Sequence, residues 1–291
     1  MTTSNGATHN CFYVRRDITE WYEDGSLWDR IEGTNGYDEF EGIFPGCYFN
    51  MSRNITAPYS TKTGTKEIVI LGCNSLSNAG HIESSDIIDS IHGIYYRLTM
   101  RHIVCAPHNT FGSSSMNDTD TTDGGYYGSK MNQEIIGLPT TTGDIGGTIN
   151  QQLYAEFGNH LISWRDRLSI SIDENAKNNR TYIESWTAST SMPRTSGMTN
   201  NTEWKLIQST LMNEAFIYGS IMCSNSAFDI GCLTSIPPAY SYSRNIVGGA
   251  AIWLRDIANK NAFSVSQAQN SCSGYRANQT FGIKPVFILA K

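Results

Sequence analysis

The residues best suited to chemistry are histidines, cysteines and clustered carboxylates, and one group has a spacing that suggests a metal site. His102, Cys105 and His108 form an HxxCxxH pattern, and imidazole and thiolate groups are the ligands that zinc prefers. The surrounding sequence, RHIVCAP, favours a strand, in which His102 and Cys105 would point to opposite faces. The spacing also matches none of the common structural zinc patterns. We therefore expect a buried strand here with no bound metal.

A second candidate is the stretch NDTDTTDGG, residues 117–125, which resembles a calcium-binding loop. Such a loop needs carboxylates at alternating positions and a glutamate at its twelfth position. Here the third carboxylate, Asp123, comes one residue late, and no glutamate occupies the twelfth position. Asn and Asp side chains hydrogen-bond to nearby backbone and so stabilise turns. The sequence therefore predicts a turn rather than a cation site.

Nucleophilic and nucleotide chemistry has no local signature. The chain contains no GxSxG elbow, no GxxxxGK[ST] loop and no GxGxxG. Cys105 and His160 could form a pair in space, so a hydrolase using Cys105 or a carboxylate pair stays open as a minor alternative. Carboxylate pairs such as Asp166 and Asp173 are interpreted as surface charge. Because no constellation satisfies the roles that an active site requires, we expect that the protein is not an enzyme.

The composition excludes several classes of partner. The net charge is −6 and the isoelectric point is near 5.5, so nothing indicates binding to nucleic acid. The longest apolar runs have the length of a strand, which predicts no membrane insertion. Seven widely spaced cysteines favour free thiols over a disulfide framework. Asn, Ser, Thr, Gly and Tyr are abundant, a mixture that is typical of adaptable binding surfaces.

The elements that would position these residues are short helices and buried strands. Apolar periodicity predicts a helix over 18–31, capped by Thr19, and an amphipathic helix over 149–160 that ends at Gly158. Shorter helices are expected over 84–98 and 211–220. Strands are expected over 42–52, 66–73, 101–107, 250–257 and 280–290, the last of them central in its sheet. The polar stretch 108–148 is long enough to be functional or mobile.

Several stretches, in order, carry a resemblance to a known family. They are ITEWYEDGSLWDRIEGTNGYDEFEGIFPGCYFNMSRNIT, RHIVCAPHNTFG, MNDTDTTDGGYYGSKMNQEIIG, INQQLYAEFGNHLISWRDRL, LMNEAFIYGS and IWLRDI…FSV…FGIKPVFILA. Together they resemble phage-encoded virion or tail-fibre-type proteins with a C-type-lectin-like fold, similar to targets of diversity-generating retroelements in gut phages. WLRD followed by a variable polar stretch and then GIKPVF is the most specific part.

The resemblance implies an α+β protein with a C-type-lectin-like fold, irregular long loops and a short N-terminal helical segment. Residues 1–40 would form an arm and short helix that serve as an assembly contact, and residues 41–291 the lectin-like domain. The first and last strands would pair. Because the EPN or QPD and WND motifs of calcium-dependent sugar-binding lectins are missing, we expect no metal and no cofactor.

The family's ligand face corresponds to residues 258–278, where small apolar residues alternate with polar ones. Small residues would hold the scaffold while their polar neighbours face outward. The expected ligand-binding residues are Asn259, Asn261, Ser266, Gln267, Gln269, Asn270, Tyr275 and Arg276. Diversification of this stretch by a retroelement is a further possibility that the resemblance raises.

The functional expectation is a virion protein, made in the bacterial host cytoplasm, that binds a host-surface receptor through this face. Its partners would be a bacterial surface protein or glycan and other virion proteins. A homo-oligomer is expected, with a trimer favoured, because multivalency strengthens weak single contacts. The alternative is a purely structural role as a capsid or tail decoration protein without receptor binding.

Overall fold

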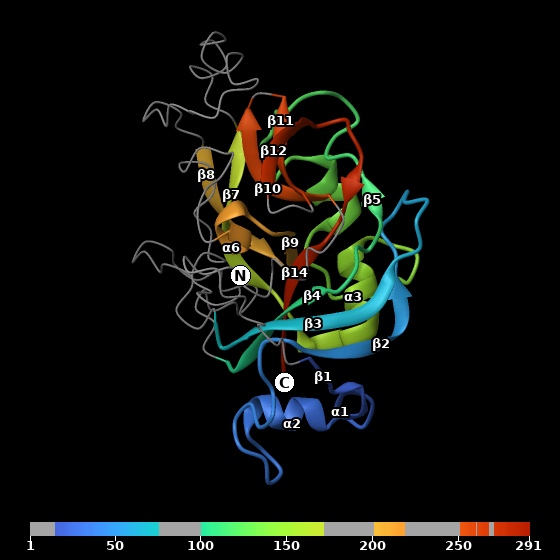
Figure 1. The fold of residues 1–291 in the computed structure, drawn as a ribbon, viewed down its shortest axis with the longest axis vertical. Helices are drawn as coiled ribbons and strands as arrows, with labels where there is room; N and C mark the ends of the chain where they lie inside the picture. Colours follow the sequence, from blue (N-terminus) through green and yellow to red (C-terminus); the bar gives the residue numbers. More distant parts are fainter. Residues whose placement is uncertain (1–14, 76–99, 172–200, 219–250, 260, 268–270) are drawn as a thin grey trace, which may run out of the picture.

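The computed structural model shows a mixed α+β protein in which strands outnumber helices (Figure 1), as the sequence predicts. The described residues are 15–75, 100–171, 201–218, 251–259, 261–267 and 271–291. The helices are α1 (Thr19–Glu23), α2 (Ser26–Glu32), the π-helix η1 (Met131–Gly137), α3 (Ile149–Phe157), the 3-10 helix η2 (Gly158–His160) and α6 (Glu214–Tyr218). The predicted helix over 84–98 lies outside the described residues.

The strands of the described residues form three sheets. The largest has the order β1 (Arg16–Asp17), β2 (Cys47–Ile55), β3 (Thr65–Cys73), β4 (His102–Pro107), β14 (Pro285–Ala290) and β6 (Leu161–Ile162), with β9 (Ser209–Leu211) also pairing with β14. The second has the order β12 (Ser271–Arg276), β11 (Ala262–Gln267), β10 (Ile252–Asn259), β13 (Phe281–Gly282) and β5 (Ser113–Ser114). The third pairs β7 (Trp164–Ser171) with β8 (Asn201–Ile207).

The last strand is central, as its sequence predicts. Every residue of β14 is buried, and the strand lies between β4 on one side and β6 and β9 on the other. The expected pairing of the first and last strands is wrong for the described chain, because β1 pairs in parallel with β2. An apolar strand gains most when both of its faces and edges are covered, which accounts for the central place of β14.

The predicted N-terminal helix is two helices, separated at Gly25. This glycine has a φ of 81°, a conformation that L side chains rarely adopt. Thr19 is not the cap: Asp17 Oδ1 accepts hydrogen bonds from the Thr19 backbone N (2.9 Å) and hydroxyl (2.6 Å). Leu27 and Ile31 of α2 are fully buried and belong to the same core as the sheets.

Helix α3 begins and ends where its sequence predicts. The Thr148 hydroxyl accepts a hydrogen bond from Gln151 N (3.3 Å), and the Gln151 side chain accepts one from Thr148 N (2.9 Å). These reciprocal bonds form a capping box, which satisfies backbone donors at the first turn. Gly158 follows the last helical residue. The helix packs on β2 and therefore covers one face of the largest sheet.

The polar stretch 108–148 is more ordered than its composition suggests. It contains β5 and η1, and it buries Phe111, Met116 and Tyr126 in the main core. Its backbone also pairs with the second sheet, since Phe281 of β13 lies opposite Ser114 of β5. The stretch is therefore part of the scaffold beneath the expected ligand face.

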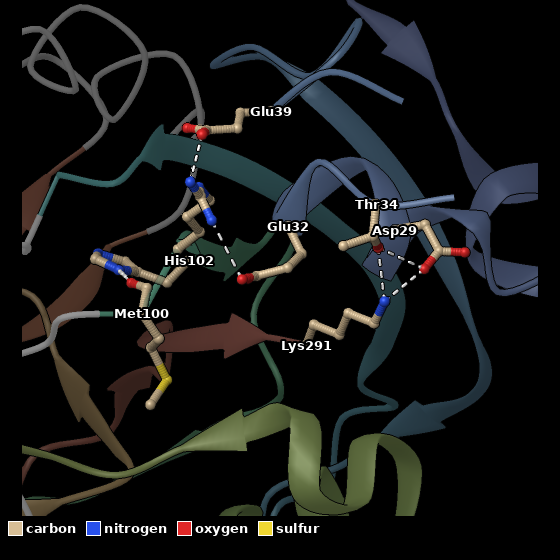
Figure 2. A network of polar contacts seen from close by, with 8 residues as sticks. Asp29, Glu32, Thr34, Glu39, Met100, His102 and Lys291 are labelled. Carbon is tan, nitrogen blue, oxygen red and sulfur yellow. Dashed lines mark hydrogen bonds and ion pairs between the residues drawn. The ribbon is translucent and has the colours of Figure 1, made fainter. Parts of the chain in front are cut away.

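Polar contacts hold the C-terminus against the N-terminal helices (Figure 2). The Lys291 ammonium donates to Asp29 Oδ1 and Thr34 Oγ1, each at 2.7 Å. Nearby, Arg101 forms ion pairs with Glu32 and Glu39. Segments at the two ends of the described chain are thus joined at one side of the molecule.

Candidate functional site

The expected ligand face lies on three antiparallel strands of the second sheet, β10, β11 and β12, at one end of the molecule (Figure 1). Strand β11 is the middle strand, with Ile252 of β10 opposite Ser266 and Tyr275 of β12 opposite Phe263. Residues Ala262 to Ser266 of β11 are buried. Strand β12 is at the edge, and its Gly274 and Arg276 are exposed. Among the described residues of these strands, the side chains that reach solvent are therefore those of β12 and Gln267 at the end of β11.

The WLRD motif anchors strand β10 to three different elements. The Trp253 indole N–H donates to the Ser114 carbonyl at 2.8 Å. The Arg255 guanidinium donates to Asp166 Oδ2 at 2.9 Å, which ties β10 to β7. Asp256 Oδ2 accepts a hydrogen bond from Glu214 N at 2.7 Å, which ties β10 to the start of α6. The motif is therefore a set of buried attachments, and these attachments fix the position of the ligand face.

Asp166 corrects one interpretation made from the sequence. Its carboxylate is fully buried and paired with Arg255, so it is not surface charge, and Asp173 lies outside the described residues. Burying two charges is costly unless each is paired and hydrogen-bonded. Nothing in the local sequence marks Asp166 as buried, because its partner is 89 positions away.

The expected site residues differ in their exposure to solvent. Tyr275 and Gln267 are partly exposed and hydrogen-bonded to each other, and the Arg276 side chain is 74% exposed. Asn261 is partly exposed, and its carbonyl accepts from Ala277 N at 2.9 Å. Ser266, by contrast, is only 1% exposed.

Ser266 is therefore removed from the ligand face. Its hydroxyl accepts a hydrogen bond of 2.7 Å from the Tyr218 hydroxyl of α6, beneath the sheet. Successive side chains of a strand point to opposite faces, and Ser266 lies on the face of β11 that α6 covers. The backbone of Asn259 pairs with Ala262 at the end of β10. Gln269 and Asn270 lie outside the described residues.

The aspartate loop adjoins the ligand face, which the sequence did not predict. The backbone N–H groups of Met116 and Asn117 donate to the Ala277 carbonyl at 2.9 and 3.0 Å. Asp120 Oδ2 lies 3.6 Å from Arg276 Nε, as an ion pair across the two segments. We call the surface at the hairpin of β11 and β12 the hairpin face; it consists of Asp120, Gln267, Tyr275, Arg276, Asn278 and Gln279.

The same loop is a turn held by side chains, as predicted. Asn117 Oδ1 accepts from Lys130 N at 2.9 Å, and its amide donates to the Thr121 carbonyl at 2.7 Å. The Lys130 ammonium pairs with Asp118. Over the described ranges, no three His, Cys, Asp or Glu side chains gather as they would around a metal ion.

The HxxCxxH segment is a buried strand, as predicted. All six residues of β4 are buried, and His102 Nδ1 hydrogen-bonds to the Met100 carbonyl at 2.9 Å (Figure 2). Burial raises the pKa of the Cys105 thiol well above its ordinary value, which disfavours the thiolate. Cys47, Cys73 and Cys272 are also free thiols.

Cys105 and His160 do not form a catalytic pair. Cys105 lies opposite Phe287 of β14, whereas His160 Nδ1 is bound to the carbonyl of Ala290 at 2.8 Å. Three positions along a strand span roughly 10 Å. Cys105 and His160 therefore meet β14 at positions that lie well apart along the strand.

Comparison with protein-family models, with curated proteins and with solved structures finds no match for this chain. Within the part of the chain that the structure describes, no helix is both long and apolar enough to cross a membrane.

Proposed function

We propose that this chain is a bacteriophage virion protein that uses the hairpin face of a C-type-lectin-like domain to bind a ligand on the host surface. The single observation that carries the proposal is the contrast between β11 and β12. The middle strand, β11, is buried except at Gln267, whereas the edge strand, β12, exposes polar side chains to solvent. A rigid scaffold that displays exposed polar side chains suits recognition.

The hairpin face has the chemistry of a polar binding surface. It combines one guanidinium, one carboxylate, a phenol and several amides. Tyr275 is fixed by its edge contact with Phe281, at 4.7 Å between ring centroids, and therefore loses little entropy on binding. Its partner would be a protein or glycan of the bacterial surface.

The Arg276–Asp120 pair leaves the hairpin face able to exchange partners. An exposed ion pair contributes about 0–1 kcal/mol to stability. A ligand carboxylate, phosphate or hydroxyl group can therefore replace Asp120 beside Arg276 at low cost. A homotrimer would present three such faces together and raise the avidity of weak contacts.

The alternative function is a purely structural one, as a capsid or tail decoration protein. One surface of the N-terminal helices favours it: the guanidinium groups of Arg16 and Arg30 lie over the Trp21 ring, 4.4 and 3.9 Å from its centroid. Aromatic and arginine side chains are enriched in protein interfaces. Under either function, this surface is suited to contact other virion proteins.

Reconstruction of the particle by cryo-electron microscopy tests the proposal. We expect the hairpin face to point away from the particle. Virions carrying Arg276→Ala should then adsorb to host cells more weakly, whereas Lys66→Ala, an exposed position on β3, should leave adsorption unchanged. Burial of the hairpin face against another virion protein, together with unchanged adsorption of Arg276→Ala virions, would establish the structural alternative instead.

A further inference from the structure

A pocket of about 390 Å³ is lined by residues of α1, α2, β2, α3 and η2. Of these elements, α1 and α2 lie at the end of the molecule opposite to β11 and β12 (Figure 1). Helices α1 and α2 contribute Tyr22, Glu23 and Trp28 to its lining. Strand β2 contributes Asn50 and Ser52, and the segment α3–η2 contributes Glu156, Phe157 and His160. Ligand sites usually have volumes between about 300 and 1,000 Å³, so the pocket has room for a small group.

The polar wall of the pocket is fixed in place by Glu156, whose side chain is 1% exposed. Its carboxylate accepts hydrogen bonds from the Tyr22 hydroxyl (2.7 Å), from Ser52 N (2.6 Å) and the Ser52 hydroxyl, and from Arg53 Nε (3.1 Å). Burial alone would raise the pKa of Glu156, and these hydrogen bonds outweigh it and lower the pKa. The carboxylate is therefore ionised, and each of its oxygens already accepts two hydrogen bonds from the protein.

The aromatic wall is equally well defined. The rings of Trp28 and His160 stack with their centroids 3.9 Å apart and their planes 2° apart. His160 Nδ1 contacts the Ala290 carbonyl at 2.8 Å. Because a carbonyl oxygen only accepts, Nδ1 must carry the proton, and in the neutral ring Nε2 is left as an acceptor. No described residue donates to that Nε2 atom.

The groups that remain for a ligand are mostly acceptors. The Tyr22 and Ser52 hydroxyls donate their protons to Glu156, so towards a ligand each can only accept. Asn50 donates to Thr19 Oγ1 at 3.3 Å and keeps its carbonyl oxygen. The exposed Glu23 carboxylate has no partner among the described residues. The pocket therefore offers negative charge, aromatic surface and more acceptors than donors, the donors being the Trp28 indole N–H and the second N–H of the Asn50 amide.

We propose that this pocket binds a protonated amine or guanidinium group, with Glu23 and His160 Nε2 as acceptors and the aromatic side chains as its apolar wall. A cation that carries several N–H donors matches an acceptor-rich lining, and aromatic rings attract cations. A neutral sugar fits less well, because it supplies no positive charge to the Glu23 carboxylate. The cation could come from a Lys or Arg side chain of a partner protein, or from a free polyamine.

Titration calorimetry on the full chain tests this inference. The probes are Nα-acetyl-lysine methylamide, Nα-acetyl-arginine methylamide and putrescine, with the neutral Nα-acetyl-norleucine methylamide and N-acetylglucosamine as comparisons. Binding of the two amino-acid amides without putrescine would identify a protein side chain as the source. Binding of putrescine alone would identify a free polyamine. The neutral probes should bind at least about tenfold more weakly, because they lack the charge-assisted bonds.

Glu23→Gln should weaken the binding of the cationic probe about five- to tenfold by removing the charge. Glu20→Gln is the matched control, since Glu20 is exposed on the same helix but does not line the pocket. Thermal unfolding should be the same for both variants. Equal binding of neutral and cationic probes, equal effects of the two variants, or no binding of any cation would overturn the inference. None of these outcomes bears on the hairpin face.

Discussion

Arg255 and Asp166 form an ion pair of 2.9 Å in which neither side chain has any solvent exposure. The pair joins β10 of the second sheet to β7 of the third sheet. A second bond from the same guanidinium reaches the Thr210 hydroxyl of β9 at 3.4 Å. One side chain thus connects all three sheets, and it supports the strands that carry the hairpin face.

Asp166→Asn should destabilise the fold strongly. The substitution leaves a buried guanidinium without its counter-charge, a change that costs about 3–5 kcal/mol. Urea unfolding followed by circular dichroism measures the loss. Asp118→Asn is the matched control, because Asp118 pairs with Lys130 at the surface and should cost less than about 1 kcal/mol. Equal losses in the two variants would show that the buried pair has no special part in stability.

Substitutions in the predicted ligand stretch, residues 258–278, should lower stability at buried positions and leave it nearly unchanged at exposed ones. Ser266→Ala removes the acceptor of the Tyr218 hydroxyl and should cost about 1–3 kcal/mol. Arg276→Ala, at an exposed ion pair, should cost less than about 1 kcal/mol. Thermal unfolding compares them. A larger loss for Arg276→Ala would mean that the guanidinium supports the fold, and its effect on adsorption could then not be assigned to ligand contact.

The sequence predicted the elements whose signals are local. The strands at 66–73 and 101–107 are runs of apolar residues, and both lie in the largest sheet. The helix over 149–160 carries its own capping box and a terminal glycine. The break at Gly25 could have been inferred from the same rules, since glycine inside a helical pattern weakens it.

The sequence did not predict how distant segments meet. The contact between Asp120 and Arg276 depends on the pairing of β5 with β13, which no local pattern encodes. Burial of Ser266 depends on α6 lying beneath β11, because an alternating polar pattern is the same for an exposed strand and for one covered on both sides. Tertiary packing decided both.

Thr148→Ala should weaken the start of α3. The substitution removes half of the capping box, and N-cap losses cost about 1 kcal/mol. Helix α3 carries Glu156, so the variant should also loosen the contacts to Tyr22 and Ser52. Hydrogen exchange of the first turn of α3 measures the effect. Thr119→Ala, at an exposed loop position, is the control and should leave exchange and stability unchanged.

Stability should rise with pH because of Lys284, which is 3% exposed and donates to the His108 carbonyl at 2.6 Å. Burial lowers the pKa of its ammonium from 10.5 to about 7. Between these two values the unfolded chain holds a proton that the folded chain lacks, so the free energy of unfolding increases with pH. Below pH 7 both states are protonated, and the cost of burying the charge is fully present.

Lys284→Met tests this directly, since it keeps a long apolar side chain and removes the titrating group. The variant should be more stable than the natural chain near neutral pH and below, and the difference should shrink as pH rises toward 10. For one proton the slope reaches about 1.4 kcal/mol per pH unit. Urea midpoints measured from pH 6 to 10 give the comparison. Parallel curves for the two proteins would mean that Lys284 keeps its charge in the folded state throughout this range.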